Sequence, residues 1–543
     1  MKNNLSGKIS LFSIIFFVIL ITLIPYIYGY LQKPSGKIFT GFIGQCGTAQ
    51  PFYLAWGPKQ VVDGHFLFED KYNGYTEKRN VFNMLWLAMG LASKFLGVSV
   101  TAIFHFERVL SAILLLYLAY LFIGKYFLGN VWRIYGIALL SFSSGFGYLL
   151  KQIDPKTWTP DLWIVESNVF HSILGEVNMP IATALLFLAI YLGHATFIEE
   201  KRIKAISTGL VTLLLGTIYP YAVISVYWIL MFVVGYKIIT ILKENGKENI
   251  ANFIVDYLKV FFISIPIILY DWYLVHLNPD FIVEQELIKS PNLIQYFLSY
   301  GIVSILAIIG IGLIVKEKNQ KYYFIIIWTI AIFTQIYFPL PFQMQLILGA
   351  QLPLVMLALL ALSFFSRKLL IQPSNIKRAA LSIFLISLLI ISSITNIYLY
   401  KNIFSSIKKY QLPEYMDRSF FEALEWLERN TRDTDLVLSS PQSTLYIPLY
   451  SSNRVYFADY LVYAPKYYEK EKEIQKLFKI DVEANFDNFD LFLSSKRIDY
   501  IFFDEQLQRI SESSMRDKLS ALKTITRVFD NGQITIYRFN HST

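Results

Sequence analysis

Acidic side chains gather in two polar loops of an otherwise very apolar chain, and their carboxylates could accept protons. The first loop contains FLFEDKYNGYTEKRNVFNMLW, residues 66–86, in which Glu69 and Asp70 are adjacent. The second loop contains Asp161 and Glu166. A carboxylate in an apolar, water-poor cleft has a raised pKa and can deprotonate a hydroxyl group as a general base. The alternative is that all four are ordinary solvated loop charges.

The two adjacent acids are expected to differ. Neighbouring side chains on an extended segment point to opposite sides, so only one of Glu69 and Asp70 should face a cleft. Glu69 follows the apolar FLF and should be the more desolvated and the better base, whereas Asp70 precedes Lys71 and could form an ion pair. We expect these acids to line one outer cleft together with Asp161 and Glu166.

No pattern of metal ligands or cofactor motifs accompanies these acids. The six histidines are scattered, and none forms a closely spaced pair or a Cys/His cluster, whereas a metal site needs three or four converging ligands. A Walker-type phosphate loop and a GxSxG motif are also missing. We therefore predict neither a metal nor a cofactor.

Tyr53 and Trp56 belong to a set of aromatics that could form an interfacial belt or stack on sugars.

The loops must be positioned by membrane-spanning helices. Of the 543 residues, 55% are hydrophobic and only 16% are charged, against about 25% charged residues in soluble domains. Apolar runs of roughly eighteen or more residues are typical of membrane spans. We expect eleven spans, the first of them retained rather than cleaved as a signal peptide. They lie at 10–30, 103–123, 134–150, 178–196, 204–218, 221–241, 258–275, 296–315, 322–338, 346–364 and 379–398.

The net charge of +9 is distributed unevenly, which argues against nucleic-acid binding. Residues 410–543 hold 17 basic and 21 acidic side chains, so the excess lies in the apolar part. With a cytoplasmic N-terminus, the cytoplasmic loops contain 18 Lys and Arg side chains and the opposing short loops contain three, as the positive-inside rule expects. This predicts a multi-pass protein of the plasma (inner) membrane, with the loop at about 31–102 and everything after residue 400 outside the cytoplasm.

The first loop and the C-terminal region should each have their own secondary structure. YLAWGPKQVVDG could form a short helix ended by Gly64, and residues 81–97 a helix lying at the membrane interface. From residue 410, the strand-like runs DLVLSS, RVYFAD, DYIFFDE and QITIYRF alternate with helical segments. We expect a transmembrane domain at 1–400 and an extracytoplasmic α/β domain at 410–543, with DLVLSS and DYIFFDE in one sheet.

This layout resembles the GT-C fold of polyprenyl-phosphate-sugar-dependent membrane glycosyltransferases, which include protein mannosyltransferases and aminoarabinose transferases. The similar segments are YLAWGPKQVVDGHFLFEDKYN, NMLWLAMGLASKFLGVS and FERVLSAILLLYLAYLFIG, and LVLSSPQSTLYIPLYSSNRVYF is similar to the tails of a poorly characterised bacterial branch. The resemblance implies a GT-C-like helical membrane protein of about eleven spans that transfers a sugar at the outer face.

One position departs from the family pattern. The family has its usual catalytic carboxylate a few residues before the tyrosine that matches Tyr53, where this sequence reads CGTAQPFY without an acid. The base has therefore moved within the first loop, or lies in the second loop, or the activity is lost. The resemblance also implies cations near the donor phosphate; the candidates are Lys71, Lys78, Arg79 and Arg108, and Tyr53 and Trp56 are candidates to contact the sugar.

Three functions follow from these observations. The first is a glycosyltransferase that takes a sugar from a polyprenyl-phosphate donor, among the membrane lipids, and transfers it to a glycan, lipid or protein acceptor. The second is a non-catalytic GT-C-like protein that binds lipid-linked glycan. The third is a transporter, which commonly carries ionisable groups at mid-membrane. Because the predicted spans are almost free of internal charge, the sequence favours the first function.

Overall fold

A computed structural model of the chain describes residues 2–44, 49–74, 78–244, 250–277, 289–369, 374–458, 467–479, 486–511 and 514–541. The chain forms two compact units. The helical unit comprises 1–25, 105–276 and 286–405, and the mixed unit comprises 26–104, 277–285 and 406–543. Most of the first loop thus groups with the C-terminal region.

Eight helices in the described part of the chain are long and apolar enough to cross a membrane, by length and composition. The count of eleven is not confirmed, because three of the expected spans are helices of 13 residues each, α6 (Asn130–Phe142), α11 (Lys204–Gly216) and α16 (Tyr323–Gln335). Thirteen residues rise about 20 Å, less than the ~30 Å hydrocarbon core. The eight are α1 (Lys2–Leu31), α5 (Val100–Tyr126), α10 (Met179–Phe197), α12 (Tyr221–Lys243), α13 (Ile250–Leu277), α15 (Leu293–Glu317), α17 (Gln351–Leu369, with η5, Gln343–Ile347, before it) and α18 (Asn375–Ser392).

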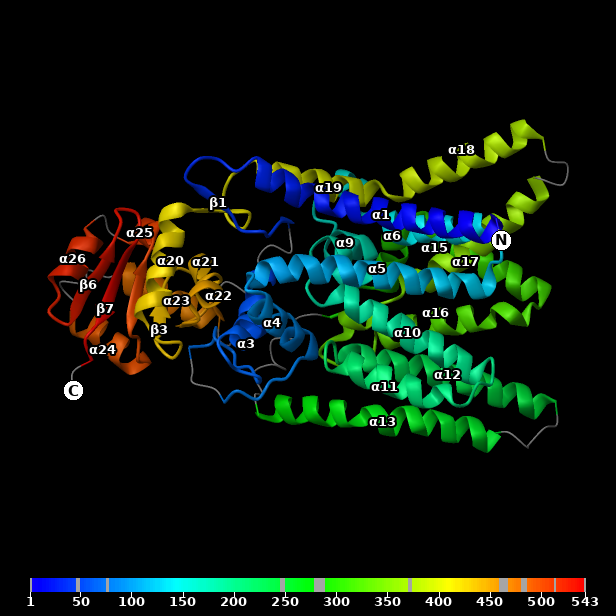
Figure 1. The fold of residues 1–543 in the computed structure, drawn as a ribbon, viewed down its shortest axis with the longest axis horizontal. Helices are drawn as coiled ribbons and strands as arrows, with labels where there is room; N and C mark the ends of the chain where they lie inside the picture. Colours follow the sequence, from blue (N-terminus) through cyan, green and yellow to red (C-terminus); the bar gives the residue numbers. More distant parts are fainter. Residues whose placement is uncertain are drawn as a thin grey trace. The chain divides into compact units, whose positions relative to one another are not determined.

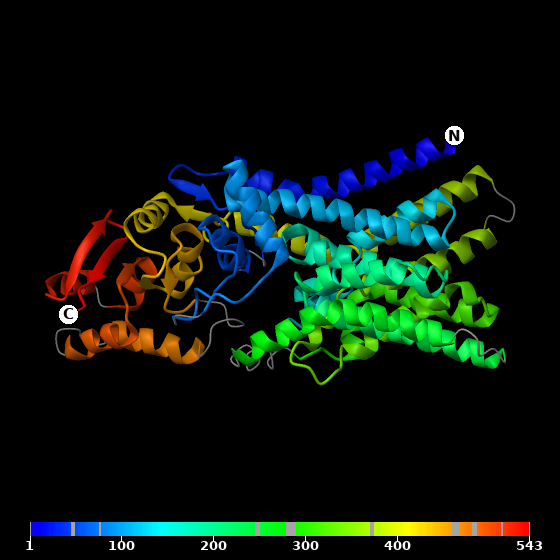
Figure 2. The same ribbon diagram turned by 60° about the horizontal axis from the view of Figure 1, so that its bottom comes forward.

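Close helix packing holds the helical unit together. Helix α17 is buried along its whole apolar window. A Cβ atom built on Gly310 of α15 would lie 2.2 Å from the carbonyl oxygen of Leu357 in α17, so only glycine allows this approach. On another side, α10, α11 and α12 pack together and run side by side (Figure 1 and Figure 2). Small residues at such contacts are typical of membrane helices.

Two expected helices are interrupted. The helix predicted at 134–150 ends at Phe142, where SSGFG begins, and continues only as the short α7 (Gly147–Ile153). The helix predicted at 379–398 breaks after Ser392, and α19 (Ile394–Ile407) follows. Helix α15 also has a kink at Gly301, whose φ of 51° lies in the left-handed region that glycine tolerates. The second loop then forms three short elements, α8 (Pro160–Trp163), η3 (Val165–Ser167) and α9 (Val169–Gly175).

The mixed unit is built on a five-stranded sheet with the order β4-β3-β5-β7-β6. Strand β3 pairs in parallel with β4 and β5, and β7 pairs antiparallel with β5 and β6. DLVLSS and DYIFFDE therefore lie in one sheet, as predicted. The strand of residues 525–530 was not expected from the sequence. The strands are β3 (Leu436–Leu438), β4 (Arg454–Val455), β5 (Tyr500–Phe503), β6 (Ile525–Asp530) and β7 (Thr535–Phe539).

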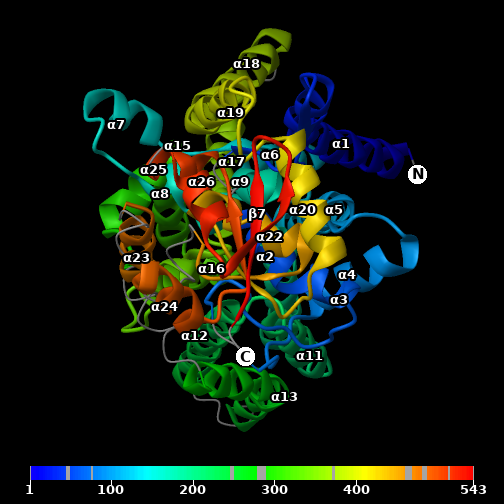
Figure 3. The ribbon, with the colours of Figure 1, turned by 90° about the vertical axis from the view of Figure 1, so that its left-hand side faces the viewer.

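Alternation along β5 explains how helices cover both faces of this sheet (Figure 3). Phe502 makes an edge contact with Phe420 of α20, whereas Ile501 and Phe503 belong to a buried core on the other face. That core also contains residues of α23, α24, α25 and α26. The helices are α20 (Arg418–Asn430), α21 (Pro441–Thr444), α22 (Ile447–Ser451), α23 (Tyr467–Lys479), α24 (Phe486–Lys496), α25 (Glu505–Ile510) and α26 (Met515–Ala521).

The first loop is helical within the mixed unit. Its elements are β1 (Lys37–Phe39), which pairs antiparallel with β2 (Tyr415–Asp417), followed by α2 (Ala49–Leu54), η2 (Ala55–Lys59), α3 (Gln60–Val62) and α4 (Met84–Leu96). Gly97 follows α4 with a φ of 65°, and Gly64 follows α3 with a φ of 101°. Both glycines thus adopt the left-handed conformation common after a helix C-terminus, and both predicted helices are confirmed.

Candidate active site

Glu69 lies at the centre of a buried ion-pair network in the mixed unit. Its Oε1 accepts a hydrogen bond from Arg79 at 2.9 Å and its Oε2 accepts one from Arg454 at 2.8 Å. Arg79 also pairs with Asp433 at 3.0 Å. The side chain of Glu69 is only 1% exposed. Both carboxylate oxygens are therefore occupied by arginines, which is the geometry of a structural ion pair.

Gln60 fixes the backbone at Glu69. Its side-chain amide donates to the Glu69 carbonyl at 2.8 Å, and its Oε1 accepts from the Glu69 N–H at 3.1 Å. A side-chain amide thus replaces the backbone partner that a strand would supply. The preceding residue, Phe68, makes a single antiparallel bridge with Val81. The backbone of Phe68 and Glu69 is therefore held by Val81 and by Gln60.

Asp70 and Lys71 are also buried. Asp70 accepts a hydrogen bond from the Tyr72 backbone N–H at 2.8 Å, the local pattern of an Asx turn. The Lys71 ammonium group donates to the Ser452 carbonyl, and burial lowers the pKa of Lys71 despite the nearby carboxylate of Glu69. Among the sequence-predicted cations of the first loop, Lys78 alone is exposed.

Of the two candidate aromatic residues, Trp56 is buried in the mixed unit and Tyr53 is half-buried. The Trp56 ring packs against Phe52 and Trp86 with centroid distances of 5.3 and 5.5 Å. Tyr53 lies near Phe52 at 5.6 Å. A Cβ atom on Gly57 would lie 2.4 Å from the Trp86 ring, so the glycine is what brings η2 against α4. Packing contacts with neighbouring aromatic rings explain the positions of both rings. The acid-free segment that precedes them, from Cys46, lies partly outside the described residues.

In the helical unit, Asp161 ties together the loop that interrupts the helix predicted at 134–150. Its Oδ2 accepts from the backbone N–H groups of Gly145 and Gly147 at 3.0 and 3.1 Å, and its Oδ1 accepts from Thr159 at 2.6 Å. Asp161 is 1% exposed. Burial raises its pKa, and these hydrogen bonds oppose that shift. The carboxyl group acts here as an acceptor for two buried N–H groups.

Glu166 is the only one of the four predicted carboxylates that is not buried. It lies in η3, is partly exposed, and accepts a side-chain hydrogen bond from Tyr219 at 3.2 Å. Burial raises the pKa of Glu166, while its own backbone N–H and the Tyr219 hydroxyl oppose that shift. The rings of Tyr219 and Tyr221 lie 5.3 Å apart, and Tyr221 packs on Phe342 at 4.6 Å. Glu166 is thus a partly exposed carboxylate beside a group of aromatic rings.

Arg108 and His171 lie in the same unit as Glu166. The Arg108 guanidinium is fully buried and donates to the carbonyl oxygens of Ile173 and Leu174 at 2.9 and 3.3 Å, at the C-terminal end of α9. Cations are favourable there. His171 is 8% exposed, and its Nε2 has no hydrogen-bond partner among the residues described. Burial lowers the pKa of His171 to about 4, so its imidazole is neutral at pH 7.

Side-chain amides hold α9 and the second loop in place, and none of these amides is among the predicted site residues. Asn168 caps α9 by accepting from the Phe170 N–H at 2.9 Å, and it donates to Asn396 at 2.9 Å. Gln351 accepts from the Val169 N–H at 2.8 Å and donates to the Ser143 carbonyl at 3.0 Å. Polar amides in or beside otherwise apolar spans were the available signal. Across the described residues, no three His, Cys, Asp or Glu side chains are placed to hold a metal ion.

No family model matches this chain, and no curated protein matches its sequence. Solved structures do match. The archaeal oligosaccharyltransferase AglB from Archaeoglobus fulgidus, in complex with an inhibitory peptide and a dolichol-phosphate, aligns over 98% of this chain and 74% of its own, with 12% identity and a TM-score of 0.52. The apo form of the Archaeoglobus fulgidus oligosaccharyltransferase aligns over 94% and 71%, with 13% identity and a TM-score of 0.53.

A third match is a mutant form of the arabinofuranosyltransferase AftD from Mycobacteria, over 96% of this chain and 41% of its own, with 10% identity and a TM-score of 0.50. These proteins are GT-C glycosyltransferases. At such low identity the matches establish the fold. The chain is therefore a multi-pass membrane protein with the GT-C fold and a small C-terminal sheet domain, as expected from the sequence.

Proposed function

We propose that this chain is a membrane glycosyltransferase that takes a sugar from a polyprenyl-phosphate donor and transfers it to an acceptor hydroxyl on a glycan, lipid or protein. The observation that carries the proposal is the alignment of 98% of the chain with an oligosaccharyltransferase solved with a dolichol-phosphate and a peptide. A dolichol-phosphate and an inhibitory peptide bound to that one protein support a lipid-phosphate donor and a separate acceptor here.

Glu166 is our candidate for the general base. A general base must reach the acceptor proton, and its pKa should lie near the working pH. Among the four predicted carboxylates only Glu166 is partly exposed, so an acceptor could reach it, and burial raises its pKa toward neutral pH. Glu69 is occupied by two arginines and Asp161 by two backbone N–H groups, which favours structural roles for both.

The proposed reaction is a single displacement at the anomeric carbon. The acceptor oxygen forms the new glycosidic bond while the bond between the anomeric carbon and the phosphate oxygen breaks. The acceptor proton moves to the Glu166 carboxylate, and the polyprenyl phosphate leaves with the bonding electron pair. The Tyr219 hydroxyl, 3.2 Å from Glu166, orients the carboxylate.

The orientation is part of the proposal. The loop charges favour a cytoplasmic N-terminus, with transfer at the outer face of the plasma membrane. A reporter that is active only after export, fused after residue 541, should be active. A cytoplasm-only reporter that is active at the same position would overturn this orientation.

The function itself is tested with the full chain in nanodiscs. The donors are undecaprenyl-phosphate-linked hexoses and pentoses, supplied with extracted membrane glycans and lipids as acceptors. We expect at least one donor to release undecaprenyl phosphate, measured by mass spectrometry, and Glu166→Gln to reduce the release. Release that is equal in empty nanodiscs, or missing for every donor, would overturn the proposal.

A second candidate is a non-catalytic protein that binds lipid-linked glycan. The observation in its favour is that Glu69 and Asp161 are held in structural networks. Such a protein would bind one of the donors above without releasing the lipid phosphate. Binding and turnover measured on the same nanodisc sample therefore distinguish the two functions.

A further inference from the structure

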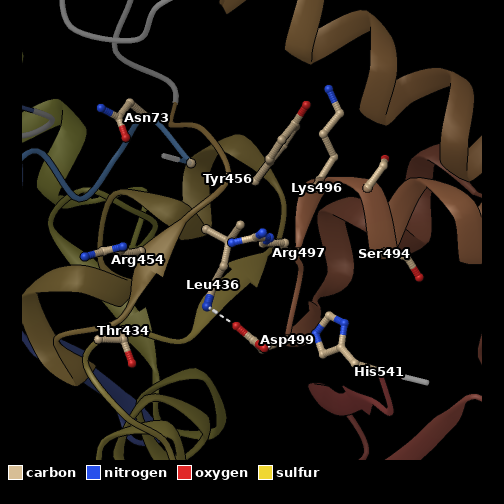
Figure 4. Close-up of a pocket in the computed structure, with 12 residues that line it drawn as sticks. Asn73, Thr434, Leu436, Arg454, Tyr456, Ser494, Lys496, Arg497, Asp499 and His541 are labelled. Atoms are coloured by element: carbon tan, nitrogen blue, oxygen red, sulfur yellow. Dashed lines mark hydrogen bonds and ion pairs between the residues drawn. The ribbon is translucent and has the colours of Figure 1, made fainter. Parts of the chain in front are cut away.

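A polar pocket of about 730 Å³ opens in the mixed unit, at the edge of the sheet where strands β3 and β5 begin (Figure 4). Its walls come from the first loop, the start of β3, β4 and the C-terminal end of α24. The lining residues used below are Asn73, Thr434, Arg454, Ser494, Lys496, Arg497, Asp499 and His541. The volume is within the range of pockets that hold a small molecule, about 300–1,000 Å³.

The charge of the lining is mainly positive. Arg454, Lys496 and Arg497 are cationic, and Asp499 is the carboxylate among the lining residues. Asp499 is engaged by the protein, because its Oδ2 accepts from the Leu436 N–H at 2.8 Å and its Oδ1 lies 3.1 Å from His541 Nε2. Lys496 pairs with Glu473 at 3.4 Å and Arg454 with Glu69 at 2.8 Å. Among the described residues Arg497 is therefore the lining cation without an ion pair, which favours an anion beside it.

Arg454 is a buried cation with donor capacity to spare. It is 7% exposed, and one end of its guanidinium is bound to Glu69. Its Nε–H has no hydrogen-bond partner in the described part of the chain. Buried arginine donors are normally satisfied. A guanidinium presents its donors as a planar fork that matches a carboxylate or a phosphate. Because the Nε–H itself is buried, Arg454 contributes positive charge to the pocket wall rather than an accessible donor.

Arg497 occupies a position that usually belongs to glycine. It follows α24 directly and has a φ of 54°, in the left-handed region. Glycine and asparagine are the common residues after a helix C-terminus because other side chains are strained there. Arg497 is exposed and no ion pair within the described ranges holds it. A strained arginine without a structural partner, on the wall of a basic pocket, indicates a ligand contact.

Neutral polar groups surround the cations. Thr434, Ser494 and Ser495 supply hydroxyls, and Asn73 supplies a side-chain amide. Hydroxyls and amides are suited to the alternating donors and acceptors of sugar hydroxyl groups. We propose that this pocket binds a sugar that carries an anionic group, a phosphate or a carboxylate, with the anion on Arg497. Its assignment to the acceptor glycan rests on the proposed transferase function, whereas the binding itself does not.

The test is a ligand-observed NMR titration of the full chain in nanodiscs. The probes are glucose 6-phosphate, glucose and inorganic phosphate. We expect glucose 6-phosphate to bind about tenfold more tightly than either other probe, since it uses both the cations and the polar groups. Equal binding of glucose and glucose 6-phosphate would overturn the anionic site. Equal binding of inorganic phosphate would overturn the sugar site.

The decisive variant is Arg497→Gly, which removes the cation and also relieves the left-handed backbone. It should keep or raise the thermal midpoint while weakening glucose 6-phosphate binding about tenfold or more. The matched control is Arg429→Ala at the exposed end of α20, whose side chain is 73% exposed and which is not part of the pocket lining. Unchanged binding in Arg497→Gly would overturn the proposal. Because the readout is binding, failed sugar transfer leaves this result standing, and failed binding leaves the transferase proposal standing.

Discussion

Glu69 and Glu166 are both loop carboxylates in a chain with few charged residues, and they differ in burial and in hydrogen-bond partners. In the mixed unit, Glu69 is 1% exposed and each of its oxygens accepts from a different arginine. In the helical unit, Glu166 is partly exposed and accepts from the Tyr219 hydroxyl. The first arrangement engages both oxygens in ion pairs and buries them. The second leaves the carboxylate accessible.

The difference shows that burial alone does not make a general base. Glu69 is the more buried of the two, but Arg454 lies 385 positions away in the chain and pairs with it. A buried carboxylate paired with arginines is stable in its charged form. A partly exposed carboxylate whose pKa is raised by burial and which has no arginine partner in the described residues is a better base. The predictions below test this contrast.

The largest expected effect is on sugar transfer. Glu166→Gln keeps the shape of the side chain but cannot accept the acceptor proton, so the transfer rate should fall roughly 10²–10⁴-fold. The rate is measured as release of undecaprenyl phosphate by the full chain at equal protein level. Glu69→Asp and Asp70→Asn serve as comparisons and should retain activity in the fraction that folds. Full activity of Glu166→Gln would remove Glu166 from the mechanism.

The next effect is on stability. Glu69→Gln removes one partner from a buried ion-pair network and leaves Arg454 uncompensated, which should cost about 3–5 kcal/mol. The thermal midpoint of the purified chain, followed by tryptophan fluorescence, should fall clearly. Glu422→Gln is the matched control, because its pair with Arg418 on α20 is exposed and its loss should cost less than about 1 kcal/mol. Equal midpoints for the two variants would contradict a structural role for Glu69.

The third prediction concerns the stability that Asp161 contributes, which should be smaller than the contribution of Glu69. Asp161→Ala should cost about 1–3 kcal/mol, because the buried N–H groups of Gly145 and Gly147 lose their acceptor. Asp161→Asn should recover most of this loss, since an amide oxygen can accept from both N–H groups. The two midpoints are measured side by side. If Asp161→Asn is as unstable as Asp161→Ala, the charge of Asp161 matters more than its role as an acceptor.

The smallest effect concerns pH. The Tyr219 hydroxyl donates to the ionised form of Glu166 and so opposes the rise in its pKa. Tyr219→Phe should therefore raise the pKa of Glu166 further. Because the base must be ionised, activity is lost as the pH falls through this pKa, and the acidic limb of the pH–rate profile should move to higher pH. An acidic limb that stays in place would show that Glu166 does not set it.

The sequence by itself determined the membrane character of the chain, the helices of the first loop and the presence of DLVLSS and DYIFFDE in one sheet. These depend on the length and period of apolar runs, which are local properties of the chain. The segment SSGFG, which follows Phe142, is also a local signal that the helix ends there. Only the tertiary structure decided that Glu69 meets Arg79 and Arg454 while Glu166 meets Tyr219. The basicity of a carboxylate depends on the donors and charges around it, and contacts between residues far apart in the chain bring those together.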